Sequence, residues 1–341
     1  MRIKKFSLFV LFLIIFLYTQ VSNAEEKRAK HIWKMASNAP IGFGVELIIR
    51  NHLNPDVKKA TNGDVVFSWY HGGIMGDNRD WLGKMKIDQL QGAGLDGSGV
   101  QLACPEMYVL QLPFMFRNFD EIAYIKKMVR SRIYDVFEKN GYKLLILLDQ
   151  AFDTIYSIKR PIRTPDDFAE TKFASYCGIV EQEIFRSLGA TPILLSVPEI
   201  ASGTRSGVTN GLLCPELWYL GAQLYTLGGY ITRSKIRYAQ GAILITLKAW
   251  NKISEKHKKA IEKASTKVES LLDQDLKEFN IKAHKAMLKY GMKEVNLTAD
   301  ELGVLKKTTR PIWNKFAGKL YPKEFLEEIL SCLKQYREEK K

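Results

Sequence analysis

Strand-like and helix-like segments alternate along this chain, and the alternation begins close to its amino end. Residues 31–40 alternate as a strand does, residues 42–61 repeat apolar side chains at helical spacing, and residues 61–73 carry a turn at Asn62-Gly63 before the β-branched and aromatic run VVFSWY. Such alternation is typical of α/β folds with a largely parallel sheet. The sequence therefore predicts an α/β fold.

A second series of strands and helices begins near the middle of the chain. It starts with YKLLILLDQAFDTIYSIK, residues 142–159, and continues through FASYCGIVEQEIFRSLGATPILLSV. Similar units on both sides of residue 150 predict two lobes: lobe I over residues 25–150, with a return segment at about 240–255, and lobe II over residues 151–239. A cleft between lobes is a common ligand site.

One segment is too long for either lobe. Residues 254–290 lack Pro and keep apolar side chains at helical spacing. A helix of that length extends about 50 Å at 1.5 Å per residue, so we expect it to brace both lobes. Residues 291–341 are expected to form C-terminal helices, opened by Thr298 and Pro322.

The first 24 residues have the pattern of a cleaved signal peptide. Basic residues precede an apolar run from Phe6 to about Tyr18, and small residues follow at Ser22 and Ala24. The run could instead remain as an anchor, but it is short for a membrane span of about 20 residues. We therefore expect a mature protein in the periplasm.

Charge, cysteine and histidine content exclude several functions. The formal charge is +14, but much of it lies in the predicted long helix, where Lys and Glu alternate as on a solvated face, so no nucleic-acid partner is expected. The four Cys form no metal-binding pattern, and a disulfide, if present, is expected between Cys177 and Cys214. The five His occupy no catalytic motif, so neither an enzyme, a metal nor a cofactor is expected.

Four segments carry a family resemblance. They are TNGDVVFSWYHGGIMGD (residues 61–77), PEMYVLQLPFMFRNFDE (105–121), KRPIRTPDDFAETK (159–172) and LGATPILLSVPEIASGTRSGVTNG (188–211). In this order and spacing, the chain resembles the DctP-type solute-binding proteins of tripartite ATP-independent periplasmic (TRAP) transporters over residues 31 to about 290. The resemblance implies a two-lobed, periplasmic-binding-protein-like fold that captures a small molecule in the interlobe cleft and passes it to a TRAP membrane permease.

The chain departs from this family where the ligand carboxylate is held. The family's strand reads Lys, an apolar residue and Arg, whereas this chain has Lys172, Phe173 and Ala174. A second family Arg aligns with Thr154, and an Asn that contacts ligand aligns with Cys214. Since Ala cannot make the two charge-assisted hydrogen bonds of a guanidinium, the resemblance predicts a different ligand.

The other expected ligand contacts are polar, aromatic or apolar residues of both lobes. Asn38 and Asp96 match polar first-lobe contacts, and Val197 replaces an aromatic residue that covers the ligand. The lining expected for an elongated hydrophobic or neutral molecule, such as a lipid or fatty acid, comprises Phe43, Trp69, Tyr176, Val197, Trp218 and Tyr219.

Two alternatives stay open. The protein could bind an ordinary organic acid through substitute basic residues, or it could be a partner-binding scaffold whose cleft is vestigial. Members that lack the Arg resemble a subgroup that works with a tetratricopeptide-repeat partner in the periplasm, so such a partner is a further expectation.

Overall fold

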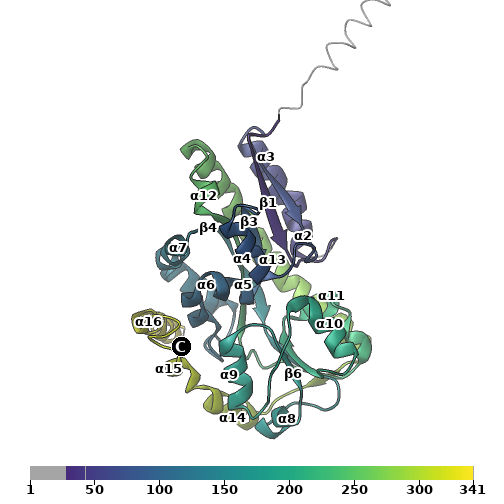
Figure 1. Cartoon of the computed structure of the whole chain (residues 1–341). Helices are drawn as coiled ribbons and strands as arrows, with labels where there is room; N and C mark the ends of the chain where they lie inside the picture. The colour runs from purple at the N-terminus through teal and green to yellow at the C-terminus, as the bar shows by residue number, and fades with distance from the viewer. Residues whose placement is uncertain (1–27, 43, 341) are drawn as a thin grey trace, which may run out of the picture.

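The computed structural model describes residues 28–42 and 44–340, whose strands form two sheets (Figure 1). The predicted signal peptide, residues 1–24, and the predicted ligand contact Phe43 lie outside these residues. The two-lobed α/β architecture with a long helix is confirmed. Each lobe is built around one of the two sheets.

The first sheet has the strand order β2-β1-β3-β10-β4. Its strands are β1 (His31–Ser37), β2 (Val65–Tyr70), β3 (Gly92–Leu95), β4 (Tyr142–Phe152) and β10 (Tyr238–Thr246). The strand β1 is parallel to β2 and β3, with His31 opposite Val65 and Met35 opposite Gly92. The strand β10 is antiparallel to β3 and β4. The sheet is thus mixed rather than largely parallel, because β10 re-enters it from the other lobe.

Helices connect and cover these strands. They are α2 (Val45–Ile48), the π-helix η1 (Ile49–Leu53), α3 (Asn54–Ala60), α4 (Asn78–Lys86), α5 (Gly97–Ala103), the 3-10 helix η2 (Pro105–Gln111), α6 (Phe119–Met128) and α7 (Arg130–Lys139). The first three follow one another without a break, where the sequence predicted one helix. The π turn precedes Pro55, whose missing N–H removes an ordinary helical hydrogen bond at that point.

The second sheet has the order β11-β9-β5-β8-β6-β7. Its strands are β5 (Thr154–Ser157), β6 (Phe173–Ser175), β7 (Ile193–Leu194), β8 (Gly211–Cys214), β9 (Tyr230–Thr232) and β11 (Lys293–Val295). The helices of this lobe are α8 (Pro165–Ala169), α9 (Ile179–Ser187), α10 (Val197–Arg205), α11 (Glu216–Gly221) and the 3-10 helix η3 (Leu224–Leu227).

The chain crosses between the two sheets at adjacent points. It passes from β4 to β5 through Asp153, and it returns from β9 to β10 through residues 233–237. The backbone N–H of Asp153 donates to the carbonyl oxygen of Arg237 at 2.8 Å. The two crossings are therefore hydrogen-bonded to each other, and they form the junction between the lobes.

The predicted bracing helix is α13 (Glu255–Lys289), 35 residues long. The Ser254 hydroxyl caps it by accepting the His257 N–H at 3.3 Å. In Figure 1, α13 extends from the part of the molecule that holds the first sheet to α11 of the second lobe. The Asn280 side chain joins both lobes to the helix, because it donates to the Gln150 carbonyl oxygen and accepts the Leu217 N–H, each at 2.9 Å.

Three carboxylates surround one ammonium group of α6 where α13 packs on β4. The Lys126 Nζ lies 3.0 Å from Asp149 Oδ1, 3.9 Å from Glu269 Oε1 and 3.7 Å from Asp273 Oδ2, and Arg130 Nη2 lies 3.8 Å from Glu269. Burial, together with the charge of Asp149, raises the pKa of Asp273 to about 6. The ionised Asp273 carboxylate therefore destabilises the fold.

The variant Asp273→Asn is expected to raise the free energy of unfolding at pH 7.5, because it removes this ionised carboxylate. The expected gain is on the order of 1 kcal/mol, since the side chain is partly solvated. The raised pKa means that the native protein gains stability as pH falls from about 7 through 6, and this gain should shrink in the variant. Denaturant unfolding between pH 5 and 8 measures both effects. Glu278→Gln, at an exposed position of the same helix, is the control, and equal pH profiles for all three proteins would contradict the assignment.

The C-terminal segment forms α14 (Ala299–Thr309), α15 (Ile312–Lys315) and α16 (Lys323–Glu339). As predicted, Thr298 caps α14, in a capping box with Glu301, and Pro322 precedes α16. The helix α16 packs on α6, where Arg337 Nε lies 2.7 Å from Glu121 Oε1. Among the described helices, none is long and apolar enough to cross a membrane.

Candidate functional site

A cavity of about 300 Å³ lies between the two lobes. Loops that follow the carboxyl ends of strands provide much of its wall: Asn38 to Pro40 after β1, Asp96 after β3, Tyr176 and Cys177 after β6, and Pro215 after β8. Ligands of α/β proteins bind at these ends, where backbone and side-chain groups from several strands converge. The cavity therefore has the position of a ligand site.

The lobes already meet on either side of this cavity. A Cβ added at Gly44 would lie 3.3 Å from Leu217 Cδ2, and one added at Gly73 would lie 4.0 Å from Pro198 Cγ. Gly44 and Gly73 belong to the first lobe, whereas Leu217 and Pro198 belong to the second. The described conformation is thus one in which the lobes close over the space between them.

The wall of the cavity is mainly apolar. Two described residues that line it, Asp96 and Arg237, belong to the charged types. The apolar part comes from both lobes and from α13, and it includes Ile49, Leu148, Val197, Leu217, Ile243 and Leu276. The rings of Tyr176 and Trp218 lie nearly parallel, with centroids 6.3 Å apart and planes at 18°. A wall of this kind suits an occupant with a large apolar surface.

The Asp96 carboxylate is already engaged by the protein. It caps α5 by accepting the N–H groups of Ser98 and Gly99 at 2.9 and 3.2 Å, and the Ser98 hydroxyl at 2.7 Å. Asn78 donates to both of its oxygens at 2.9 Å, and Asn38 donates at 3.3 Å. Its negative charge therefore has a structural function at the helix terminus.

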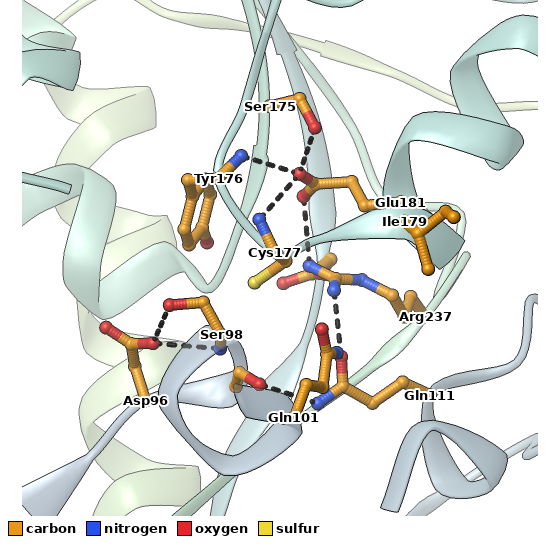
Figure 2. Close-up of polar contacts among 12 residues, drawn as sticks. Asp96, Ser98, Gln101, Gln111, Ser175, Tyr176, Cys177, Ile179, Glu181 and Arg237 are labelled. Atoms are coloured by element: carbon orange, nitrogen blue, oxygen red, sulfur yellow. Dashed lines mark hydrogen bonds and ion pairs between the residues drawn. The ribbon is translucent and has the colours of Figure 1, made fainter. Parts of the chain in front are cut away.

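The Arg237 guanidinium is held between two buried carboxylates at the junction of the lobes. Its Nε donates to Asp153 Oδ2 at 2.7 Å, and its Nη2 donates to Glu181 Oε1 at 3.2 Å and lies 2.5 Å from Asp153 Oδ2. Its Nη1 donates to Gln111 Oε1 at 2.9 Å. Arg237 is 2% exposed, and both carboxylates are 0% exposed. Figure 2 shows Arg237 between Glu181 of the second lobe and Gln111 of the first.

Glu181 also organises the loop before its own helix. Its Oε2 accepts the Ser175 hydroxyl and the Tyr176 N–H at 2.8 Å and the Cys177 N–H at 2.9 Å, as Figure 2 shows. Burial raises the pKa values of Asp153 and Glu181, and the charge of Arg237 opposes this rise. Burial alone would lower the pKa of Arg237, but Asp153 and its neighbours raise it, so the guanidinium stays charged.

Five of the predicted ligand contacts line the cavity. They are Asn38, Asp96, Tyr176, Val197 and Trp218. The first two come from the first lobe and the other three from the second, so the structure brings residues that are far apart in sequence to one space. Their role in binding stays a prediction.

Five other predicted contacts are not among the described residues that line the cavity. Trp69 donates from Nε1 to Asn54 Oδ1 at 2.9 Å and stacks on the His71 ring. Tyr219 stacks on Tyr156 with centroids 3.7 Å apart. These aromatic rings are thus occupied by protein partners.

The remaining three, Thr154, Ala174 and Cys214, lie together in the second sheet. Thr154 is opposite Cys214 in the register of β5 and β8, and Ala174 lies on the neighbouring β6. All three are buried, and Thr154 Oγ1 donates to Glu216 Oε1 at 3.0 Å. In the family, the resemblance implies polar ligand contacts at these three positions. In this chain the side chains there are small and buried in the sheet, so they do not line the cavity.

All four cysteines are free thiols, so the disulfide considered between Cys177 and Cys214 is absent from the described structure. Cys177 lines the cavity, whereas Cys214 is buried in the sheet. Burial raises the pKa of both thiols well above the usual range, which keeps them protonated and weakly nucleophilic. The described residues contain no cluster of three His, Cys, Asp or Glu that could hold a metal ion.

Sequence reasoning missed the residues at the back of the cavity. Arg237, Gln111, Gln150 and Leu276 line it and come from four distant segments. One signal was present: in SKIRYAQGAILIT, Arg237 directly precedes a mostly apolar segment, which is an unusual place for a solvated charge. Its carboxylate partners, 84 and 56 residues away, could not be identified from the sequence.

Comparisons with known proteins give a family match over most of the chain. Residues 45–319 match the model of the bacterial extracellular solute-binding proteins, family 7, DctP. The C4-dicarboxylate-binding periplasmic protein DctP of Rhodobacter capsulatus is 24% identical over 271 residues, which is 77% of this chain and 80% of the relative.

Solved structures show the same fold at low identity. A TRAP periplasmic solute-binding protein of Sulfurospirillum deleyianum with bound succinate has a TM-score of 0.80 and 20% identity, covering 89% of this chain and 99% of that one. A protein of the same description from Roseobacter denitrificans, with bound β-D-glucuronate, has a TM-score of 0.81 and 19% identity, covering 87% and 98%.

Proposed function

This chain belongs to the DctP family of bacterial extracellular solute-binding proteins, and from that premise we propose that its cavity captures an elongated apolar or neutral molecule. The chain is a solute-binding protein of the TRAP transporter family. The family implies delivery of the bound solute to a TRAP permease, and its members act in the periplasm. What remains to be proposed is the chemical class of the ligand.

The apolar wall carries this proposal. An organic acid placed against it would lose hydration of its carboxylate without gaining the bidentate guanidinium contact that Ala174 cannot supply. An apolar chain loses little on leaving water and gains from each methylene that it buries, by about 0.8 kcal/mol. The open space of about 300 Å³ also supports capture of a ligand over a vestigial cleft filled by side chains.

One observation favours a second candidate, an organic acid. Arg237 lines the cavity and is a basic residue that the sequence did not place there. The relatives described above are named for, or hold, carboxylate ligands. Binding of an acid would require Arg237 to donate a hydrogen bond to the ligand carboxylate while it still donates to Asp153 and Glu181.

Mass spectrometry of the protein purified from a periplasmic extract tests the proposal. We expect native spectra to show a bound mass and an organic extract to contain an apolar or neutral compound. A dicarboxylate or sugar acid as the sole bound compound would rule the apolar ligand out in favour of the second candidate. A tetratricopeptide-repeat partner stays a prediction from the resemblance.

The variant Val197→Asp is expected to weaken the binding of apolar cargo at least tenfold, which is about 1.4 kcal/mol. The substitution places a carboxylate on the apolar wall, where it must lose water when cargo enters. Displacement of a fluorescent fatty-acyl amide by the extracted compound measures the change. Val304→Asp, at an exposed position of α14 away from the cavity, is the matched control. If both variants bind as the wild type does, Val197 does not contact the cargo.

A further inference from the structure

The charge balance around Arg237 bears on what the cavity rejects as well as on what it holds. One guanidinium faces the two buried carboxylates of Asp153 and Glu181. If both carboxylates are ionised, the group of three carries a net negative charge; if one holds a proton, the group is neutral. In neither state does it present a positive charge to a ligand, and Asp96 adds a further carboxylate to the wall.

Arg237 nevertheless keeps a hydrogen-bonding function. A guanidinium has five N–H groups. Nε and Nη2 are occupied by Asp153 and Glu181, and Nη1 makes one bond to Gln111. Among the described residues, the second hydrogen of Nη1 has no acceptor. Since Arg237 lines the cavity, this hydrogen is available to an acceptor on a ligand.

The other lining groups near this point are also uncharged. Gln111 is fixed, because its Oε1 accepts from Arg237 and from Gln101, and its Nε2 faces the Gly97 carbonyl oxygen at 3.5 Å. The Cys177 thiol lies on the same side of the cavity and stays protonated. A ligand end group at this place therefore meets neutral donors and a guanidinium whose charge is balanced.

We propose that Asp153 and Glu181 determine the charge selectivity of the cavity: by neutralising Arg237 they exclude carboxylates and leave a donor for an uncharged acceptor, such as an amide, ester or alcohol oxygen. This inference rests on the proposed capture of an apolar molecule and specifies its polar end. The charge selectivity would let the cavity bind a neutral lipid or fatty amide in preference to a free fatty acid. The apolar wall alone does not distinguish these ligands.

Decanamide and decanoate are suitable probes, because they share a chain and differ in charge at pH 7.5. Calorimetric titration of the purified, delipidated wild-type protein is expected to show at least tenfold tighter binding of decanamide. In Asp153→Asn and Glu181→Gln, Arg237 faces one carboxylate instead of two, so a ligand carboxylate is repelled less and this preference should fall at least fivefold. Glu216→Gln is the control: its buried carboxylate bonds Thr154 and lies outside the cavity wall, and the preference should persist.

Equal binding of both probes by the wild type, or an unchanged preference in folded Asp153→Asn and Glu181→Gln, would overturn the charge selectivity while apolar capture survives. Circular dichroism verifies the fold; if both variants unfold, the wild-type preference alone decides. If the wild type binds neither probe, apolar capture fails and succinate decides the selectivity. We expect that the wild type does not bind succinate and that Asp153→Asn binds it measurably. Succinate binding by the wild type, or no succinate binding by the folded variant, would overturn the proposed charge selectivity.

Discussion

Replacing Arg237 with Met is expected to lower the free energy of unfolding by about 3–5 kcal/mol, because it leaves two buried carboxylates without their cation. Asp153 and Glu181 are fully buried, and one oxygen of Asp153 already lacks a partner in the described structure. Without the guanidinium, both carboxyl groups must either remain charged in an apolar environment or take up protons.

The pH dependence of this variant gives a second signature. Burial raises the pKa values of both carboxyl groups in the native protein, and removing the opposing charge of Arg237 raises them further. A raised native pKa favours protonation on folding, so the variant should recover stability as pH falls from 7.5 to 5. Urea unfolding at the two pH values measures the recovery.

Arg233→Met provides the matched control for Arg237→Met. Arg233 lies in the same crossing, its side chain is 49% exposed, and its Nε is 3.4 Å from Glu216 Oε1. Loss of such an exposed pair changes stability by about 1 kcal/mol or less. Equal destabilisation by the two substitutions would show that the ion pairs of Arg237 do not hold the junction together.

Gly178→Ala is expected to destabilise the protein by about 2–5 kcal/mol, the sum of backbone strain and overpacking. Gly178 has φ of 81°, and an added Cβ would overlap the Tyr108 hydroxyl and lie 2.8 Å from Gln101 Oε1. The substitution would push the loop that carries Tyr176 and Cys177 away from Glu181. Binding of decanamide should therefore weaken together with thermal stability.

Gly207→Ala separates the two causes. Gly207 has φ of 79°, but an added Cβ would meet nothing within 4 Å. Its substitution should show the backbone strain alone, about 1–2 kcal/mol, with ligand binding unchanged. If Gly178→Ala behaves no worse than this control in thermal unfolding and titration, the close packing around Gly178 does not position the loop.

The fold could be predicted because its signals are local. The alternation of strands and helices, the long uninterrupted helix, and the cap at Thr298 all lie within short windows of sequence. The mixed sheet direction was missed, because it depends on β10 returning from the other lobe, which no local pattern records. One helix was expected where a π turn precedes Pro55, although the Pro was visible in the sequence.

The site was predicted only where residues follow strand ends directly. Asn38, Asp96 and Tyr176 come immediately after β1, β3 and β6, so topology alone brings them to the cavity. Trp69 and Tyr219 were expected in the site on residue type, but each is stacked on another ring. The pairing of Arg237 with Asp153 and Glu181 depends on three-dimensional proximity and on burial, neither of which the spacing in the sequence contains.

Asn280 connects the long helix α13 to both lobes by hydrogen bonds. Its amide holds a carbonyl from the end of β4 and an N–H from the start of α11, so a change in the angle between the lobes must strain or rotate α13. Thermodynamic reciprocity then applies. A partner that bound this helix only when the lobes are open would weaken ligand binding by the same factor by which the ligand weakens binding of that partner.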